Sequence, residues 1–503
     1  MTLGNEVTVG SELAAVLPVL EKPWYRTAHL LRLNTCLLFV TFSATGMGFD
    51  GSMMNGLESL STWNSYFNNP SSSLLGTCNG VLNLGPIVFG GLVSWLADRF
   101  GRRKPVIFGC MVIILATVLQ TAAQNFGMFI AARFLLGIGI EFCMVPSPVL
   151  ATELAYPTHR AKFTSLLYTF YFVGAIVSSW TTYDTSHMNT SSWSWRIPSL
   201  LQLVLPTIQL VAFYWVPESP RWLISKGRVP EARAILVKHH ADGDEDSALV
   251  NFEIQEIQHY LRVDADSGLS GWSQIWKTKA DKKRLALVVY ISFMSQWCGN
   301  GVVSYYLSLI LDTVGMTSSG QKTLINGLIQ IVGWISAIIG GLLVDRVGRR
   351  PLWLTSICGM LAAYTAWTVF SSLYASNASH DLAIAVLALI FVFQVCYSIV
   401  VTPLCTSYPV EIPPFHSRQK VMGLAYMGNS CANLFNSFVS PVALTAISWR
   451  YYIVYIALLT QFLVVVYLFF PETRGHGLEQ ISDLFESEAL LSLFTRKVLK
   501  KQS

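Results

Sequence analysis

This chain contains a series of long stretches made almost entirely of apolar residues, and they limit the folds that it can adopt. A helix needs roughly 20 residues to cross the ~30 Å hydrocarbon core of a bilayer, and each stretch is close to that length. Lipid offers no partner to a free backbone amide or carbonyl, so each stretch is predicted to be a helix. The sequence therefore predicts an all-α membrane protein with twelve transmembrane helices, at residues 29–49, 75–97, 106–123, 128–150, 164–182, 196–216, 285–311, 323–343, 352–373, 383–406, 421–439 and 448–470.

The charged residues support this reading by their number and by their position. They make up 13% of the chain, against roughly 25% in soluble domains, which excludes an ordinary soluble protein. Of these charges, 22 fall in the 68 positions from Pro217 to Arg284, so one hydrophilic segment divides the apolar stretches into two sets of six. The predicted organisation is a tail, a six-helix bundle, a helical linker, a second six-helix bundle and a second tail, at residues 1–28, 29–216, 217–284, 285–470 and 471–503. Amphipathic surface helices are expected at 229–240, 248–262 and 478–493.

Lysine and arginine mark the side on which each loop lies, because positive residues accumulate on the cytosolic side of membrane proteins. The loops at 50–75, 183–195 and 374–382 contain neither residue, whereas the alternate loops and the linker are rich in both. Both termini and the linker are therefore predicted to be cytosolic, in a multi-pass protein expected in the plasma membrane. Two glycosylation sequons, at Asn189 and Asn377, fall in predicted outer loops and agree with this topology.

The two halves of the chain repeat the same charged motifs. Asp98-Arg-Phe-Gly-Arg-Arg103 matches Asp345-Arg-Val-Gly-Arg-Arg350, at an offset of 247. Glu153, followed by an arginine seven residues later, matches Glu411 at an offset of 258. Pro217-Glu-Ser-Pro-Arg221 matches Pro471-Glu-Thr-Arg474 at an offset of 254. Parallel repeats of this kind are typical of transporters that bind their substrate between the halves, near the middle of the membrane.

These motifs resemble those of the sugar porters of the major facilitator superfamily, over nearly all of residues 46–475. The segments Glu153-Leu-Ala-Tyr-Pro157 and Gln296-Trp-Cys-Gly299 also resemble the fungal lactose-permease-like branch of that family. The resemblance implies two pseudo-symmetric six-helix bundles, the major facilitator fold, and alternating access. It also implies a charged network that holds helix ends together on the cytosolic side while the outer side is open and separates when the cytosolic side opens. By resemblance its members are Asp98, Arg99, Arg102, Glu153, Arg160, Glu218, Arg221, Asp345, Arg346, Arg349, Glu411, Arg418, Glu472 and Arg474.

Three ionisable residues inside the predicted spans are candidates for proton coupling, because charges within a bilayer are costly and are usually functional. Asp50 ends the first predicted span and Arg133 begins the fourth, both at the outer side. The resemblance makes Asp50 the proton carrier and Arg133 its partner, which keeps Asp50 ionised until a proton releases the pair. A static ion pair is the alternative. Glu141, two turns deeper than Arg133, is a second candidate that could instead form hydrogen bonds within the bundle.

The sugar site is expected to combine side-chain amides, which donate and accept hydrogen bonds, with aromatic faces. Asn429 and Asn433 share a helix face, and with Gln296 they occupy positions that match amides of the family. The candidate sugar ligands are Gln296, Asn300, Tyr305, Tyr306, Asn326, Asn429, Asn433 and Tyr168. Small residues at Ser295, Gly301, Gly333 and Thr406 replace larger family residues, so an enlarged cavity and a disaccharide or another bulky polyol are expected.

The predicted function is the import of a sugar, a disaccharide or a hexose, by proton symport. A facilitative uniporter is the runner-up. A non-transporting sugar sensor is less favoured, because sensors of this fold usually have a long signalling tail. The spans contain neither metal-ligand spacing nor a nucleophile–base set, so no enzyme activity, metal or cofactor is expected. The expected partners are the sugar, protons and the lipid bilayer, with no nucleic acid, and a monomer is expected to suffice for transport.

Overall fold

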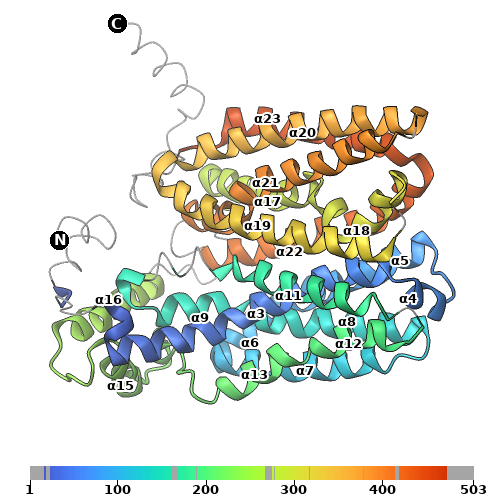
Figure 1. The fold of residues 1–503 in the computed structure, drawn as a ribbon. Helices are drawn as coiled ribbons and strands as arrows, with labels where there is room; N and C mark the ends of the chain where they lie inside the picture. The colour runs from blue at the N-terminus through green and yellow to red at the C-terminus, as the bar shows by residue number, and fades with distance from the viewer. Residues whose placement is uncertain are drawn as a thin grey trace, which may run out of the picture.

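The computed structural model shows a bundle of long helices arranged in two groups (Figure 1). It describes residues 16–18, 23–159, 163, 167–188, 190–266, 275–276, 278–316, 318–377, 379–413 and 418–472, and these residues contain no β-strand. In Figure 1 the helices of the first half lie below those of the second half, with their axes roughly along one direction. The bundle axis is therefore the membrane normal that the apolar spans require.

The first half is built from six helical rods, several of which are interrupted. The uninterrupted rods are α3 (Ala28–Ser59), α7 (Arg103–Thr121) and α11 (Phe170–Thr185). The interrupted rods are α5 (Ser72–Gly80) with η2 (Val81–Asn83) and α6 (Leu84–Phe100), α8 (Phe126–Met144) with α9 (Pro146–Leu154), and α12 (Trp193–Leu201) with α13 (Val204–Ala212). A short helix, α4 (Ser61–Tyr66), follows α3.

The second half repeats this arrangement with longer helices. It contains α17 (Lys279–Trp297) with α18 (Asn300–Thr313), then α19 (Ser319–Val347), α20 (Arg349–Asn377), α21 (His380–Glu411), α22 (Arg418–Ile447) and α23 (Tyr452–Phe469). In the described part of the chain, nine helical segments are long and apolar enough to span a membrane, and the last of them contains both α22 and α23. Counting these two separately, and adding α11 and the α12–α13 rod, gives the twelve predicted helices.

Two predicted span boundaries differ from the structure for an identifiable reason. The first span was expected to end at residue 49, but α3 continues to Ser59, so Asp50 lies inside the helix. The extension is polar in sequence, yet its residues are buried against other helices that supply hydrogen-bond partners. At the other end of the bundle, α17 begins at Lys279, before the predicted start at 285, with Thr278 Oγ1 accepting from Asp281 N at 3.0 Å.

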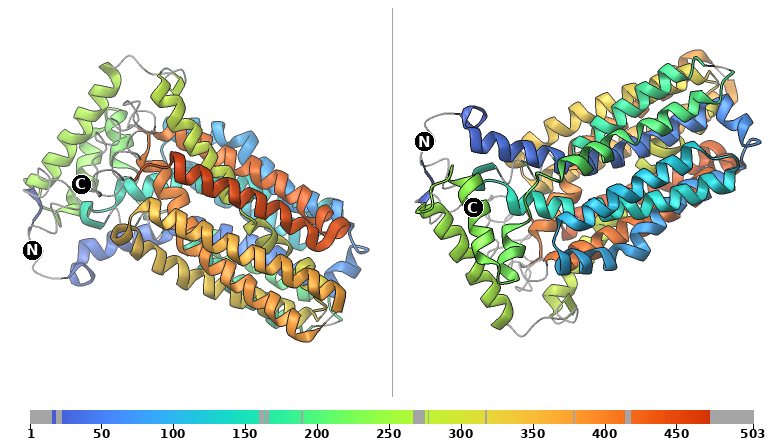
Figure 2. Two further views of the ribbon diagram at one scale, coloured as in Figure 1. Left: turned by 90° about the horizontal axis from the view of Figure 1, so that it is seen from above. Right: turned by 90° about the horizontal axis from the view of Figure 1, so that it is seen from below.

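The linker forms three helices at one end of the bundle, here called the linker end (Figure 2). They are α14 (Pro220–Ser225), α15 (Val229–His240) and α16 (Ala248–Asp266); the predictions were 229–240 and 248–262. Buried His240 contacts Glu253 Oε2 of α16 at 2.8 Å and the Leu154 carbonyl of α9 at 3.2 Å. The linker helices therefore pack on the first half. The predicted helix at 478–493 lies outside the described residues.

Glycines allow α3 and α11 to pack with almost no space between their backbones. A Cβ atom added at Gly48 would lie 1.8 Å from the Tyr171 carbonyl oxygen, and one at Gly174 would lie 1.8 Å from the Thr45 carbonyl oxygen. Small residues at such crossings are the usual means by which helices associate in lipid. This contact fixes α3, which carries Asp50, against a neighbouring helix of the same half.

Candidate functional site

A buried ion pair lies inside the first half, between α3 and α8. Asp50 and Arg133 are each 1% exposed, and Arg133 Nη1 donates to Asp50 Oδ1. The same carboxylate oxygen accepts from Gln202 Nε2 at 3.1 Å, from the break between α12 and α13. Asp50 Oδ2 and Arg133 Nε have no hydrogen-bond partner among the described residues. The described residues therefore leave one polar atom of each member of the pair without a hydrogen bond.

Sequence reasoning predicted the partnership of Asp50 with Arg133 and missed Gln202. A glutamine in an apolar span carries no charge, and at the level of sequence it cannot be distinguished from an amide that joins two helices. The structure shows that Gln202 supplies the second donor to Asp50.

Glu141 lies deeper along α8 and is separate from the pair. Its side chain faces α6, where a Cβ atom added at Gly90 would lie 3.0 Å from Glu141 Oε1. The described residues form no hydrogen bond with its carboxylate, and the residue is 6% exposed. Hydrogen bonding within the bundle was the alternative to a proton-binding role for Glu141. The described residues do not form such hydrogen bonds with its carboxylate.

Four of the eight predicted sugar ligands form two hydrogen-bonded pairs on α17, α18 and α22, which we call the amide cluster: Gln296 with Asn429, and Tyr305 with Asn433. Gln296 Nε2 donates to Asn429 Oδ1 at 3.1 Å. Asn429 Nδ2 donates in turn to Ser295 Oγ at 3.2 Å. Asn433 Nδ2 donates to the Tyr305 hydroxyl at 3.3 Å, which links α22 to α18.

The amide cluster also reaches the first half of the chain. Asn433 Nδ2 donates to Asn83 Oδ1 at 3.1 Å, and Asn83 lies in η2, the break between α5 and α6. Tyr305 is close enough to Asp50 and Arg133 for their charges to act on its hydroxyl. The cluster and the ion pair are therefore neighbours across the interface between the halves. Asn83 is a candidate ligand that sequence reasoning missed.

The other four predicted ligands have different partners. Asn300 Oδ1 accepts from Ser304 Oγ within α18 at 3.2 Å, and the Tyr306 hydroxyl donates to the Ser437 carbonyl at 2.7 Å. Asn326 Nδ2 joins the halves by donating to hydroxyls of α3 and α11. Tyr168 forms a hydroxyl–hydroxyl hydrogen bond with Tyr426 of the second half.

The expected enlargement of the cavity is wrong at two of the four positions. A Cβ atom added at Gly301 would lie 2.0 Å from Asn436 Nδ2, and one at Gly333 would lie 2.5 Å from the Phe172 ring. The space left by each missing side chain is therefore occupied by a neighbouring one. These two glycines accommodate Asn436 and Phe172 and do not leave room for a larger substrate.

The halves are joined closely at the end of the bundle opposite the linker helices, here called the far end. Asn55 Nδ2 donates to the Val303 and Ser304 carbonyls at 3.2 and 2.8 Å, and Leu307 N donates to Asn55 Oδ1 at 3.0 Å. A Cβ atom added at Gly76 of α5 would lie 2.9 Å from the Ser437 carbonyl oxygen of α22. The far end is therefore closed in this structure.

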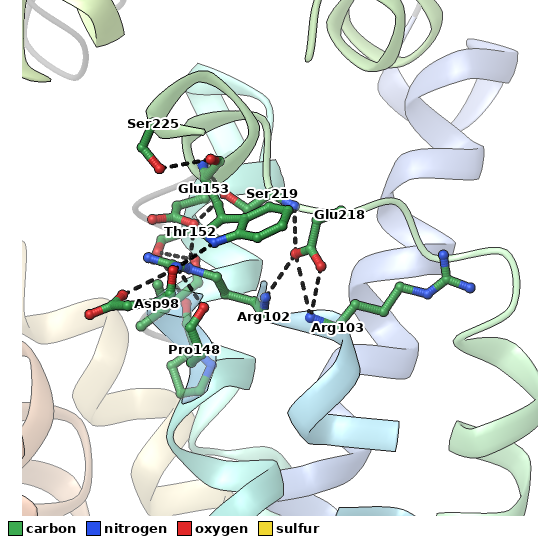
Figure 3. Close-up of polar contacts among 12 residues, drawn as sticks. Asp98, Arg102, Arg103, Pro148, Thr152, Glu153, Glu218, Ser219 and Ser225 are labelled. Atoms are coloured by element: carbon green, nitrogen blue, oxygen red, sulfur yellow. Dashed lines mark hydrogen bonds and ion pairs between the residues drawn. The ribbon is translucent and has the colours of Figure 1, made fainter. Parts of the chain in front are cut away.

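The first charged turn ties several helices of one half together at the linker end (Figure 3). Arg102 lies 3.2 Å from Asp98 Oδ1 and 3.4 Å from Glu153 Oε2. Glu218 accepts hydrogen bonds from the backbone amides of Arg102 and Arg103 at 2.9 and 3.3 Å. The carboxylate of Glu218 thus caps the start of α7, where free amides favour a negative charge.

The second charged turn has the same geometry. Glu472 accepts from the backbone amides of Arg349 and Arg350 at 3.0 and 3.1 Å, at the start of α20. Arg350 Nη2 donates to the Tyr467 carbonyl at 2.7 Å, as Arg103 Nη2 does to the Tyr214 carbonyl at 3.0 Å. These contacts lie within each half, so they hold each half together as a unit.

The other predicted residues of the charged network, and the two sequons, lie outside these two groups of contacts or outside the described residues. Arg99 lies over the Trp95 ring at 5.3 Å, Arg346 is exposed and Arg221 is half-buried. Asn377 is exposed at the end of α20. The residues or side chains that lie outside the described part of the chain are those of Arg160, Asn189, Asp345, Glu411, Arg418 and Arg474.

Comparison with known families and proteins gives a consistent result. The family described as "Sugar (and other) transporter" matches residues 36–485. "MFS glucose transporter mfs1" of Aspergillus flavus is 27% identical over 483 residues, which cover 89% of each chain. The "High-affinity glucose transporter" of Kluyveromyces lactis is 28% identical over 480 residues, 91% of this chain and 86% of the relative. "MFS-type transporter criB" of Aspergillus cristatus is 29% identical over 461 residues, 90% and 93% of the two chains.

Solved structures show the same fold. The proton:xylose symporter XylE bound to 6-bromo-6-deoxy-D-glucose superposes with a TM-score of 0.75 at 23% identity, over 90% of this chain and 99% of the other. The inward-open xylose transporter XylE from E. coli gives a TM-score of 0.73, at the same identity and coverage. The twelve-helix major facilitator fold is therefore confirmed, and the lactose-permease-like branch stays a prediction.

Proposed function

Since this chain belongs to the sugar (and other) transporter family, we propose that it imports a sugar together with a proton by alternating access. The linker end and both termini face the cytosol, and the far end faces the outside of the plasma membrane. The excess of lysine and arginine at the linker end supports this orientation. The Kluyveromyces lactis relative is a glucose transporter, which supports the substrate class. XylE is a proton symporter, which supports the coupling.

The observation that carries the proposal is the ion pair of Asp50 with Arg133 beside the amide cluster. Both residues are 1% exposed, and Tyr305 of the cluster lies within reach of their charges. A proton on Asp50 removes its attraction for Arg133 and lets the pair separate. Because Tyr305 also contacts Asn433, that change reaches the residues proposed to bind the sugar. Glu141 is a further candidate for proton transfer toward the linker end.

The amide cluster provides the sugar site. Gln296, Asn429 and Asn433 present donors and acceptors, and Asn433 Oδ1 is buried without a partner among the described residues. A sugar hydroxyl would satisfy such atoms, and a substrate lacking that hydroxyl would leave them unpaired, which gives selectivity. Asn436 and Phe172 fill the spaces beside Gly301 and Gly333. Of the two substrates predicted from the sequence, a hexose is therefore favoured over a disaccharide.

Alternating access is provided by movement of the two halves against each other. The charged turns at Glu218 and Glu472 tie helices together within each half, so each half can move as a unit. The Tyr168–Tyr426 contact joins the halves nearer the linker end, and the Asn55 contacts join them at the far end. We propose that these two contacts break in turn as each side opens.

Proton symport is tested by adding sugar to energy-depleted cells that carry the protein at their surface. Symport predicts that the medium becomes more alkaline when sugar is added. In energised cells, symport predicts that an uncoupler abolishes accumulation. A facilitative uniporter would take up sugar with no change in the pH of the medium and no effect of the uncoupler. Such a result would contradict the coupling while leaving sugar transport intact.

Substrate choice is tested by competition of labelled glucose uptake with a panel of monosaccharides and disaccharides. A hexose site predicts strong competition by hexoses and weak competition by disaccharides. Stronger competition by a disaccharide would contradict the hexose site and favour the enlarged cavity that the sequence predicted. No uptake of any sugar by protein shown to be at the cell surface would favour a sugar sensor.

A further inference from the structure

A buried carboxylate at the far end has no part in the proposed site. Glu58 is the penultimate residue of α3 and is 7% exposed. Its Oε1 accepts from Asn79 Nδ2 of α5 at 2.8 Å, whereas Oε2 is buried and has no hydrogen-bond partner in the part of the chain that the structure describes. One neutral donor is poor compensation for a carboxylate that has been removed from water.

The groups around Glu58 do not supply a free positive charge. The cation whose charge acts on it is Arg133 of α8, and Arg133 already donates to Asp50. The titratable groups near Glu58 on the helices packed around it are Cys78 of α5, Arg133 of α8 and Tyr306 of α18. Asp50, on the same helix as Glu58, acts on Cys78. A protonated carboxyl group fits these surroundings better than an ionised one.

The corresponding place in the second half contains no carboxylate. At the 247-residue offset of the charged turns, Asn79 corresponds to Asn326. Asn326 Nδ2 donates to Ser52 Oγ at 3.2 Å and to Ser179 Oγ at 3.1 Å, so its partners are neutral hydroxyls. The repeated fold therefore does not require a carboxylate beside this asparagine, and Glu58 needs an explanation of its own.

Glu58 lies where the halves meet at the far end. It follows Asn55 by three residues, and Asn55 binds the backbone of α18 at Val303, Ser304 and Leu307. Tyr306 of α18 lies near enough to Glu58 for the charge of Glu58 to act on its hydroxyl. The backbone of Tyr306 is kinked, with φ −131° and ψ 28°. Movement of α3 and α5 away from α18 would expose Glu58 to water, and water stabilises its ionised form.

We propose that Glu58 is a proton-binding site that controls closure of the far end, where the proton comes from the solution outside. This rests on the proposed function, because alternating access supplies an open and a closed far end. The ionised carboxylate stabilises the open far end, in which it is hydrated. A proton taken up from outside neutralises Glu58 and lets α3 and α18 close around it. Acidic external solution therefore favours closure whether or not sugar is bound.

The test measures the width of the far end directly. Spin labels are attached at Ser65→Cys in α4 and Ser376→Cys in α20, both exposed positions, after the native cysteines have been replaced by serine. Distances between the labels are recorded in lipid nanodiscs from pH 5.5 to pH 8.5 without sugar. We expect the parent protein to move from a short, closed distance to a longer, open one as the pH rises.

Three variants make the test specific. Glu58→Gln should keep the short distance at every pH, because glutamine imitates the protonated acid. Asp184→Asn removes an exposed carboxylate of α11 near the far end and should leave the pH response unchanged. Asn79→Ala removes the donor that lies 2.8 Å from Glu58 Oε1. Asn79 moves with Glu58 because α3 and α5 move together, and its amide favours the ionised form, so its loss should move the midpoint to higher pH by about one unit.

Two outcomes would overturn the proposal. One is a distance that does not depend on pH in the parent protein, and the other is a pH response of Glu58→Gln equal to that of the parent. If Glu58→Gln does not fold, an unchanged midpoint in Asn79→Ala has the same force. None of these outcomes depends on sugar uptake, so they leave the proposed function to be tested separately.

Discussion

The two halves of this transporter are nearly identical at their charged turns and very different in their middles. Glu218 and Glu472 cap equivalent helices through the same backbone contacts. Among the described residues, however, the first half buries Asp50, Glu58, Arg133 and Glu141 along its rods. In the second half, the ionisable residues of the described spans lie at or near helix ends, and amides line the middle. The repeated charged turns therefore belong to the fold that the halves share. The residues in the middle of the spans differ between the halves, and we assign the function to these.

Helices α11 and α22 show this difference position by position. At the offset of 258 residues, Asn429 and Asn433 correspond to Tyr171 and Ala175, so the amides occur on one side only. The same offset relates Tyr168 to Tyr426, which bind each other across the interface. Equivalent positions can therefore meet at the pseudo-twofold axis while their neighbours have diverged. We interpret this as proton coupling by the first half and sugar binding by the second.

The largest effect on stability is expected when the buried ion pair of the first half, Asp50 with Arg133, is disrupted. Arg133→Ala leaves Asp50 without its cation, and removing one member of a buried ion pair typically costs about 3 kcal/mol or more. We expect a clear fall in the thermal unfolding midpoint of the purified protein at pH 7.5.

The double variant Asp50→Asn, Arg133→Gln is the control for this experiment. It removes both charges, so most of the lost stability should return. If the double variant is as unstable as Arg133→Ala, Arg133 stabilises the protein through packing, and the ion pair is not the important feature of the first half.

A smaller effect is expected at the charged turns, where the halves should respond alike. Gly101 has φ +97° and Gly348 has φ +105°, a region in which other residues cost about 1–3 kcal/mol. An added Cβ atom would lie 2.3 Å from Glu218 Oε2 at the first turn and 2.8 Å from Glu472 Oε2 at the second. Both Gly101→Ala and Gly348→Ala should lower the unfolding midpoint, the first somewhat more. A large effect at one turn and none at the other would contradict the structural equivalence.

The smallest effect concerns the neutral middle of the second half. Asn429→Ala removes contacts to Gln296 and Ser295, and the loss of one such hydrogen-bonding group typically costs 1–2 kcal/mol, or roughly tenfold in the KM for sugar. Sugar-induced proton uptake should persist at saturating sugar. Ser178→Ala in α11 is the matched control, because its buried hydroxyl has no partner in the described part of the chain. An unchanged KM in Asn429→Ala would remove the amide cluster from the sugar site.

The fold could be predicted from the sequence because its main determinants are local. The length of an apolar stretch and the position of lysine and arginine each act on a single segment. Helix boundaries were less predictable, since α3 continues to Ser59 through polar residues such as Asn55. The hydrogen-bond partners of Asn55 come from α18, more than two hundred residues away.

The candidate site could be predicted only in part, and charge explains the difference. Asp50 and Arg133 stand out in an apolar span because a buried charge needs a partner. Gln202 and Asn83 carry no charge, and only the structure shows that they contact Asp50 and Asn433. Glu58 was missed because α3 was expected to end at residue 49, which placed Glu58 in a solvated loop.

The division of labour between the halves is tested most directly by sugar transport in Asp50→Asn. The variant is compared with the wild-type protein in accumulation against a gradient and in exchange of labelled for unlabelled sugar across the membrane. Our account predicts that accumulation is lost while exchange continues at a comparable rate, because the sugar site of the second half is intact. A variant that still concentrates sugar would contradict the account, since the proton would then be carried by another group.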